Sequence, residues 1–537
     1  MIEQDIDVLS KSDKLQDLKD VLERFLITNE NLFTFPSLNE NNRRVLLWTA
    51  LFQHVQKKSS EPIHDMCLAV LRVLSRDKEG LDKLFCEKWI TVLIEKSGLY
   101  NYVSVDEAST PTGDMERKEV VLEALKCLCN SAFNSEVARA LCAHTSIAQA
   151  LIGRLRVFKD VPNKDEVMLY DMKLLFILTA FRADVNMKVK NELHGLDYLT
   201  SGLNELLSEA SAGQQDIGDH QQAIACEILK VQYNLIVHVH PNCPLHDSLN
   251  SMYLKLMPIL ASLLNAQVSN ESKLMELHSN VANLLTSIPI EFYPYLTAEL
   301  DKDEACQYEY DCKNMDALQS LVGLLQNRLI NATSIETQFE ELSPVLTVML
   351  KSVRSCRTHR KYLRQVVLPP LRDVSMPPEK GDTLRNMLCK LLTTPITSVR
   401  DLVAEFLFVL CKEKVGRLVK YTGFGNAAGH LAQKGLLGGG RGAEYSSSSD
   451  DSNTEEYLEA QPHIDPVVGC TRPPRVNPFE GMTEEQKEYE AMKLVNLFDK
   501  MVSEGVVKPA RIGPDGRPQP LDHVLELREN APNRPQS

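Results

Sequence analysis

The side chains best suited to chemistry in this chain are polar residues that recur at a nearly constant interval. They end similar apolar segments and are separated by 54, 52, 52 and 53 residues: Arg76, Asn130, Arg182, Asn234 and Ser287. Guanidinium and amide groups recognise carboxylates and peptide backbones through hydrogen bonds. If the interval is a structural repeat, these side chains form one row that can bind an extended or helical peptide. The alternative is that they only bond neighbouring loops.

Two further cations strengthen the first part of this row. Arg72 precedes Arg76 by one helical turn, and Lys126 precedes Asn130 by one turn. Positive charge beside hydrogen-bonding groups favours a partner that carries a terminal carboxylate. The sequence therefore predicts a partner-binding polar row made of Arg72, Arg76, Asn130, Arg182 and Asn234.

A basic segment predicts a second binding function, for phosphate. Arg354, Arg357, Lys361 and Arg364 recur at helical spacing in a stretch without acidic residues, so we expect one helix with a basic stripe. Nucleic acid is an alternative ligand. The net charge of −14 and the lack of interleaved aromatic residues disfavour it.

The ligand of the basic stripe is predicted to come from a serine-rich acidic stretch later in the chain. Ser447 and Ser448 each have an aspartate three residues later, and Ser452 has Glu455 at that offset. Acid-directed protein kinases favour this pattern, and each phosphate adds roughly −1.5 to −2 charges. Phosphorylated serines could then bind the stripe; the alternative is an inert solvated acidic run.

Motifs of covalent catalysis are missing from the sequence. It has no Gly-x-Ser-x-Gly elbow, Walker loop, His-Glu-x-x-His or Cys-x-x-Cys. His238, His240, Cys243 and His246 lack a recognised zinc-ligand spacing. We therefore expect no catalytic residues, no metal and no cofactor.

A glycine-rich stretch, 423–429, invites comparison with a dinucleotide-binding loop but follows a helical segment instead of a strand. We expect it to form a tight turn. Asn426 is then expected to cap a short helix that Gly435 ends.

The repeat interval defines the fold class. Helical periodicity dominates from about residue 14 to 434, and an interval of 52–54 residues carried by helices is typical of an α-solenoid. We predict an all-α, armadillo/HEAT-like superhelix over 1–434. A flexible Gly/Ser/acidic linker is expected over 435–476.

The tail, 477–537, is predicted to contain an amphipathic helix at about 483–504. Thr483 and Gln486 have capping-box spacing. Leu494, Val495, Phe498 and Met501 share one face of this helix. An apolar face needs a surface to cover it, which is either the superhelix or a partner.

The composition predicts a soluble intracellular protein. The first residues lack a signal-peptide pattern, and no run approaches about 20 uncharged apolar residues. Many of the 13 cysteines lie in apolar helical segments, so we expect them to be reduced. We also expect a monomer.

Several long strings resemble the synembryn family, also called resistance-to-inhibitors-of-cholinesterase proteins. These strings are Leu74–Asp77, Leu125–Asn130, Val367–Val374, Ala404–Cys411, Lys420–Gly429 and Asn477–Val495. The similarity covers nearly the whole chain. It implies an armadillo/HEAT-repeat chaperone and guanine nucleotide exchange factor for heterotrimeric G-protein α subunits, located in the cytoplasm and recruited to the cell cortex or plasma membrane through its partner.

The resemblance also implies roles for individual residues. The concave face of the repeats would bind the C-terminal helix of the α subunit, which places Arg72, Arg76 and Asn130 among the contacts. The family's acid-directed phosphosites align with Ser452 and Ser447. The tail helix would approach the switch region of the nucleotide domain.

Two other functions compete with this one. A nuclear-import adaptor also uses armadillo repeats and an asparagine row, but it needs a tryptophan beside each asparagine, and the only tryptophans are Trp48 and Trp89. A chaperone or adaptor scaffold without exchange activity differs only in kinetics, so the sequence alone does not separate it from an exchange factor.

Overall fold

The computed structural model describes residues 3–103, 117–212, 216–237, 246–300, 306–331, 334–438, 453–472 and 481–521. The chain divides into two compact units, Met1–Ala298 and Glu299–Ser537. The predicted phosphosites Ser447, Ser448 and Ser452 lie outside the described residues, and so do His238, His240 and Cys243.

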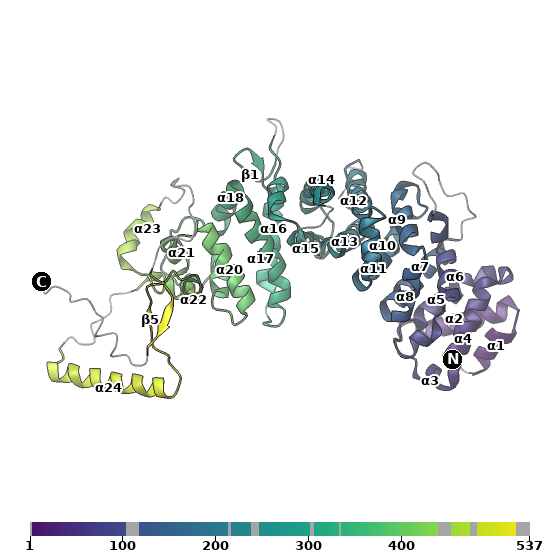
Figure 1. Ribbon diagram of the computed structural model, residues 1–537, viewed down its shortest axis with the longest axis horizontal. Coiled ribbons are helices and arrows are strands. Elements are labelled where there is room, and N and C mark those ends of the chain that lie inside the picture. The colour runs from purple at the N-terminus through teal and green to yellow at the C-terminus, as the bar shows by residue number, and fades with distance from the viewer. Residues whose placement is uncertain are drawn as a thin grey trace. The chain divides into compact units, whose positions relative to one another are not determined.

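The first unit is built from α-helices and short 3-10 helices (Figure 1). The α-helices are α1 (Glu3–Lys11), α2 (Leu15–Asn29), α3 (Pro36–Asn39), α4 (Arg43–Gln56), α5 (His64–Leu74), α6 (Glu87–Lys96), α7 (Lys118–Asn134), α8 (Glu136–His144), α9 (Ile147–Arg156), α10 (Lys164–Phe181), α11 (Ala183–Asn191), α12 (Gly195–Ala212), α13 (Asp219–Ile236), α14 (His246–Asn265) and α15 (Glu271–Ser287). The 3-10 helices are η1 (Glu40–Asn42), η2 (Lys58–Ile63), η3 (Leu81–Leu84), η4 (Leu99–Tyr102), η5 (Phe158–Asp160) and η6 (Ile290–Leu296).

One layer of the first unit consists of helices that pack in series. In this layer α2 packs against α5, α5 against α7, α7 against α10, α10 against α13, and α13 against α15. On α7, Leu125 and Leu128 are fully buried, whereas Glu123, Lys126 and Asn130 lie on the partly exposed face. This 3.6-residue pattern is the one expected for a repeat that buries its apolar face against its neighbours.

In its described residues, the second unit combines helices with three two-stranded hairpins. Its helices are α16 (Asp316–Asn331), α17 (Gln338–Ser355), α18 (Arg357–Val367), α19 (Leu384–Leu391), α20 (Thr397–Leu410), α21 (Val415–Thr422), α22 (Phe424–Lys434), α23 (Glu455–Ala460), η7 (Gln461–His463) and α24 (Glu484–Ser503). The antiparallel pairs are β1 (Glu309–Tyr310) with β2 (Lys313–Asn314), β3 (Ile464–Asp465) with β4 (Cys470–Thr471), and β5 (Ala510–Ile512) with β6 (Pro518–Pro520).

Helix α20 forms the centre of the second unit. It packs against α17, α18, α19, α21 and α22. Val403, Phe406 and Leu407 are fully buried, as expected for a helix that is apolar on most sides. The mostly helical composition and the serial packing confirm the predicted all-α, armadillo-like class.

The prediction of a flexible linker over 435–476 needs a correction. Residues 453–472 instead form α23 and the β3–β4 hairpin, and they pack onto the second unit. Tyr457 and Cys470 are buried, and the backbone N–H of Thr471 donates to the carbonyl of Val374 at 2.8 Å. The linker prediction rested on the serine-rich and acidic composition of the stretch, which does not indicate that Tyr457 and Cys470 are buried.

The glycine-rich stretch was predicted to form a tight turn with Asn426 as a helix cap, but residues 424–429 belong to α22 and Gly423 occupies the cap position. Gly423 has φ 75° and precedes α22, and Gly435 ends α22 in the left-handed region. Asn426 lies inside the first turn and donates to the carbonyl of Thr422 at 2.9 Å and to the carboxylate of Glu379 at 3.0 Å.

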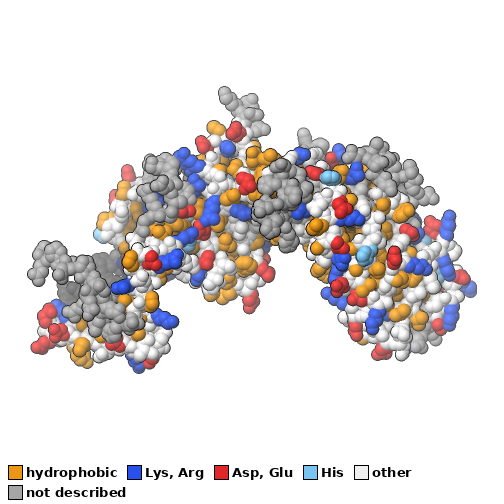
Figure 2. Space-filling view, in the orientation of Figure 1, with side chains coloured by type: hydrophobic (Ala, Val, Ile, Leu, Met, Phe, Trp, Pro, Cys, Tyr) orange, Lys and Arg blue, Asp and Glu red, His pale blue; other side chains and the backbone are white. Residues whose placement is uncertain are grey.

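The described surface carries mixed charges. Figure 2 shows basic and acidic side chains interspersed over the visible face of each unit. Within the described residues, no helix is both long and apolar enough to span a bilayer, and no cluster of three or more His, Cys, Asp or Glu side chains is arranged to hold a metal ion.

Candidate functional site

Two asparagines of the polar row make equivalent hydrogen bonds between neighbouring helices. The side-chain amide of Asn130 on α7 donates to the backbone carbonyl of Arg72 on α5 at 3.2 Å. Asn234 on α13 donates to the carbonyl of Phe176 on α10, also at 3.2 Å. Both bonds span 58 residues of sequence. The asparagines therefore join helices of successive repeats, where the stated alternative to partner binding was bonds to neighbouring loops, and they remain partly exposed.

Charged pairs repeat beside these asparagines on the same face. Lys126 contacts Glu123 at 2.9 Å on α7, and Lys230 contacts Glu227 at 3.0 Å on α13. Arg72 adds a hydrogen bond of 2.6 Å from its Nε to Glu123. The predicted cation Arg72 is thus partly neutralised, so this end of the row presents a mixed network instead of two isolated positive charges.

Arg76 follows the end of α5 by two residues, and its side chain lies beside an exposed aromatic ring. Its guanidinium carbon is 5.4 Å from the centroid of the Phe33 ring, which is 68% exposed. Partial burial and the nearby charge of Arg72 lower the pKa of Arg76. Arg76 and Phe33 together offer a cation and an apolar surface to a ligand.

Arg182 does not occupy the position that the interval assigned to it. The equivalent asparagine bonds align Phe176 with Arg72, so Ala180, four residues after Phe176, corresponds to Arg76. Arg182 follows the last residue of α10 and pairs with Asp184 through its Nε (3.0 Å) and Nη2 (2.5 Å). This pair lowers the pKa of Asp184. Arg182 is therefore displaced by two residues along the chain from the position equivalent to Arg76.

Two exposed phenylalanines extend the row and were not predicted. Phe133 on α7 and Phe181 on α10 are 54% and 55% exposed, and their rings meet edge to face with centroids 6.5 Å apart. Lys78 lies 5.6 Å from the centre of the Phe133 ring, and the Arg139 guanidinium lies 4.7 Å from that of Phe181. The signal for Phe133 was its position three residues after Asn130, on the polar face.

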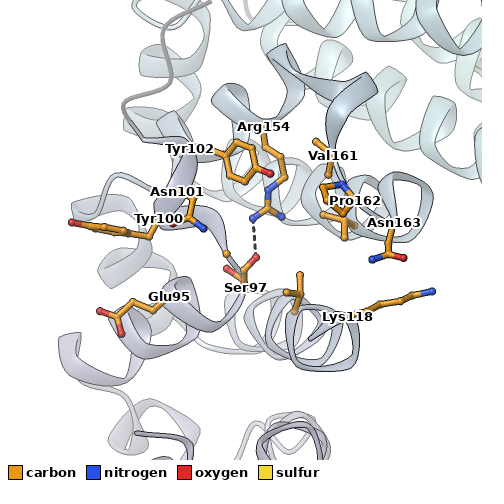
Figure 3. A pocket seen from close by; sticks show the side chains of 13 residues that line it. Glu95, Ser97, Tyr100, Asn101, Tyr102, Lys118, Arg154, Val161, Pro162 and Asn163 are labelled. Atoms are coloured by element: carbon orange, nitrogen blue, oxygen red, sulfur yellow. Dashed lines mark hydrogen bonds between the residues drawn. The ribbon is translucent and has the colours of Figure 1, made fainter. Parts of the chain in front are cut away.

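Arg154 lines a cavity of about 220 Å³ in the same unit (Figure 3) and is buried against Asp171. Arg154 on α9 donates from Nη1 to both carboxylate oxygens of Asp171 on α10, at 3.2 and 3.3 Å, and from Nη2 to the carbonyl of Ser97 at 2.8 Å. Burial raises the pKa of Asp171 to about 6, although Arg154 opposes this shift. Because its bonds join three segments, we interpret Arg154 as a structural residue.

The predicted basic stripe is divided between two helices. Helix α17 ends at Ser355, Cys356 is extended (φ −147°, ψ 157°), and α18 begins at Arg357. Arg354 therefore belongs to a different helix from Arg357, Lys361 and Arg364. The break occurs because Cys356 caps α18 by accepting from the backbone N–H of His359, whose ring is buried.

Two of the four predicted phosphate ligands, Arg354 and Arg364, are held by side chains of other helices. Arg354 pairs with Glu405 on α20, which also contacts Lys434 at 2.9 Å. Arg364 is only 8% exposed and donates to the hydroxyl of Tyr421 at 3.2 Å. Arg357 and Lys361 keep their places on the accessible side of α18.

Lys420 on α21 contacts the first described residue after the serine-rich stretch. Its Nζ donates to Oδ1 of Asn453 at 2.6 Å and lies 4.6 Å from the centre of the Tyr457 ring. Asn453 directly follows Ser452 in the sequence. Lys420 is thus a phosphate ligand candidate that the helical-spacing argument missed, because it lies on another helix.

The tail helix α24 starts where the capping box predicts. The Thr483 side chain accepts from the backbone N–H of Gln486 at 3.3 Å, and Gln486 in turn accepts from the N–H of Thr483 at 3.1 Å. No residue of α24 is buried. Leu494, Val495 and Phe498 are 65%, 43% and 38% exposed, so the predicted apolar face is uncovered.

An all-α repeat unit with an accessible row of polar and aromatic side chains, followed by an uncovered amphipathic helix, defines an armadillo-type protein-binding protein. The family model described as guanine nucleotide exchange factor synembryn matches residues 67–517. The chain therefore belongs to the synembryn, or Ric-8, family of exchange factors and chaperones for G-protein α subunits, whose activity is not covalent catalysis.

Curated relatives align over almost their full length. Chaperone Ric-8 of Drosophila melanogaster is 37% identical and covers 96% of this chain and 95% of its own. Chaperone Ric-8A of Danio rerio is 38% identical, with coverages of 92% and 91%. Among solved structures, SYS-1 aligns with a TM-score of 0.45 and 14% identity over 84% of this chain and 71% of its own.

Proposed function

We propose that this chain binds a G-protein α subunit that is GDP-bound or newly synthesised and free of βγ, promotes release of GDP, and holds the nucleotide-free form until GTP binds. The observation that carries this proposal is the exposed face of α5, α7 and α10, where Phe133 and Phe181 stand beside the polar row. Exposed aromatic residues flanked by cations are a common feature of protein-binding surfaces.

The proposed ligand of this face is the C-terminal helix of the α subunit. Phe33, Phe133 and Phe181 offer apolar surface, and burial of such rings would supply most of the affinity. Arg72 and Arg76 would orient a helix that ends in a carboxylate. Asn130 and Asn234 keep the helices of the row in register through their inter-helix bonds. The Arg182–Asp184 pair lies at the edge of this surface.

Exchange follows from this binding without any covalent step. If the chain binds the nucleotide-free α subunit more tightly than the GDP-bound form, GDP binding is weakened by the same factor, because binding linkage is reciprocal. Withdrawing one helix from the α subunit would disturb the nucleotide site, and the repeat surface would replace the packing that the helix loses. Such a protein also stabilises an incompletely folded α subunit, which is a chaperone activity.

The tail helix would supply a second contact. Leu494, Val495, Phe498 and Met501 form an apolar face that is not covered within the described residues, and amphipathic helices bind grooves through such faces. Two contacts on one partner raise the overall affinity because the second binding event is intramolecular. We propose that α24 binds the nucleotide domain of the α subunit near its switch region.

Phosphorylation by an acid-directed kinase is proposed to strengthen the complex. Support comes from the contact between Lys420 and Asn453, which brings a cation next to the residue that follows Ser452. Phosphates on Ser452, Ser447 or Ser448 would bind Lys420, Arg357 and Lys361, with Arg354 and Arg364 completing the cationic surroundings. This would fix the serine-rich segment on the second unit.

The experiment that tests the proposed function measures GDP release and GTPγS uptake by purified α subunits, with and without the chain. Faster release supports exchange. A stable complex without acceleration supports the alternative, a chaperone or scaffold that does not promote exchange. Light scattering of the purified complex tests the expected monomer, which predicts one chain per α subunit.

A further inference from the structure

Helix α22 is contacted by a β-hairpin at its N-terminal end. The backbone N–H groups of Phe424 and Gly425 donate to the carbonyls of Pro466 and Val467, both at 2.8 Å. A Cβ atom on Gly423 would lie 3.0 Å from the carbonyl oxygen of Val468. Glycine is thus required there because the backbone of the β3–β4 hairpin approaches the helix closely.

The second hairpin, β5–β6, contacts the opposite end of α22 in a similar way. The backbone N–H of Leu437 donates to the carbonyl of Gly516 at 3.3 Å. A Cβ on Gly516 would overlap the carbonyl oxygen of Gly435, and a Cβ on Gly435 would lie 2.9 Å from the carbonyl oxygen of Asp515. Both glycines also have left-handed backbones, with φ 70° and 71°. The two segments can approach this closely only with glycine on each side.

The β5–β6 hairpin has its own internal hydrogen bonds. Gly513 donates to the carbonyl of Arg517 at 2.8 Å, and Gly516 donates to that of Gly513 at 3.0 Å. Leu521 is buried and donates to the carbonyl of Pro509 at 2.9 Å. A turn held in this way can bind α22 as a unit instead of as a loose strand.

The tail helix α24 immediately precedes this hairpin in sequence. It ends at Ser503, seven residues before β5 begins at Ala510. Because no side chain of α24 is buried, its location depends on the segments attached to its ends and not on packing of the helix itself. Figure 1 shows β5 near α22, while α24 stands apart from the helices of the unit.

We propose that the β5–β6 hairpin is a mount that fixes the C-terminal side of α24 to the end of α22, with Gly435 and Gly516 as the positioning residues. The mount leaves the apolar face of α24 exposed while it restricts where that face can lie. This restriction reduces the conformational entropy lost when a partner binds the helix. The consequence for α-subunit binding rests on the proposed function; the docking of the hairpin does not.

Hydrogen exchange of single amides in the full chain tests the docking. The Leu437 amide reports the hairpin contact, the Leu436 amide, bonded to Leu431 at 2.8 Å, reports the end of α22, and the Gly513 amide reports the hairpin itself. We expect Gly435→Ala to accelerate exchange at Leu437 by about tenfold or more while Gly513 stays protected. Gly505→Ala is the matched control, because Gly505 has φ 72° and open space around its Cβ position.

A chain that ends at Gly505 supplies the undocked reference. If Leu437 exchanges equally fast in the full chain and in this truncated chain, the hairpin is not docked and the proposal is wrong. If docking is lost in Gly435→Ala but the affinity for the α subunit is unchanged, the hairpin does not position α24. If deletion of α24 itself leaves the affinity for the α subunit unchanged, the proposed role of the tail in binding is wrong. Exchange at Leu437 still shows in that case whether the hairpin is docked on α22.

Discussion

The side-chain amide of Asn130 donates a hydrogen bond to the backbone carbonyl of Arg72, so the polar row is built into the packing of its own repeats. Its asparagines connect helices, and its exposed aromatic residues face outward. Stability and partner binding can therefore be separated by mutation, since the two tasks belong to neighbouring but different side chains.

Removing the inter-helix hydrogen bond should weaken the repeat locally. We expect Asn130→Ala to lower the free energy of local opening of α7 by about 1 kcal/mol, which is roughly fivefold faster amide exchange. Asn234→Ala should have the same effect on α13. Asn283→Ala, at an exposed position of α15, is the control. Unchanged exchange in both variants would show that these bonds do not stabilise the repeats.

The exposed aromatic pair should matter for binding more than for folding. Phe133→Ala and Phe181→Ala are expected each to weaken α-subunit binding by about fivefold or more, since aromatic anchors at interfaces cost over about 1 kcal/mol when truncated. The Kd is measured by titration calorimetry. Phe339→Ala, 47% exposed on α17, is the matched control. Equal affinities for all three variants would exclude this surface.

A charge on the apolar face of the tail helix should weaken binding without unfolding the chain. We expect Phe498→Glu to raise the Kd for the α subunit because a carboxylate cannot be buried in an apolar contact. The thermal midpoint should stay constant, since α24 has no buried residue. Lys493→Glu, at a position that is 67% exposed, controls for the change of charge. A similar loss in both variants would point to electrostatics instead of the apolar face.

Lys420 should be required for the effect of phosphorylation. We expect acid-directed kinase treatment to increase α-subunit affinity in the wild type and to have little effect in Lys420→Ala, because that variant lacks the cation beside Asn453. The gain should also shrink as salt concentration rises. Lys390→Ala, exposed on α19, is the control. A full response in Lys420→Ala would place the phosphate elsewhere.

The buried Asp171 should make stability depend on pH in a defined direction. Its folded pKa, raised from 3.8 to about 6, means that the folded state binds the proton more tightly than the unfolded state. The stability that the folded protein gains from protonated Asp171 is complete below pH 3.8 and is lost as pH rises through about 6. Between pH 5 and 7.5 the loss should be about 1.4 kcal/mol. Urea unfolding at both values should show this difference in the wild type and not in Asp171→Asn.

The fold and part of the site could be predicted from sequence because they depend on periodicity. Apolar residues at 3.6-residue spacing and a repeat of about 53 residues specify the helical layer, and the capping box at Thr483 specifies the start of α24. The asparagines were identified for the same reason, since Asn130 and Asn234 occupy equivalent positions in the last turns of α7 and α13.

The remaining features depend on contacts between distant segments, which periodicity does not encode. Ala180, not Arg182, matches Arg76, because α10 ends later than a constant interval implies. The predicted basic stripe is divided at Cys356, because this residue is the N-cap of α18 and so ends the continuous helix that the charge spacing implied. The position of Phe133 after Asn130 was a local signal for that residue, but neither its pairing with Phe181 nor the Lys420–Asn453 contact has a local signature.

The rate of GDP release from a purified α subunit tests the central claim most directly. We predict that the wild-type chain accelerates release and that a chain carrying both Phe133→Ala and Phe181→Ala does not, while Phe339→Ala behaves as the wild type. Equal acceleration by the double variant and the wild type would contradict the claim that this face of the repeat binds the α subunit to promote exchange.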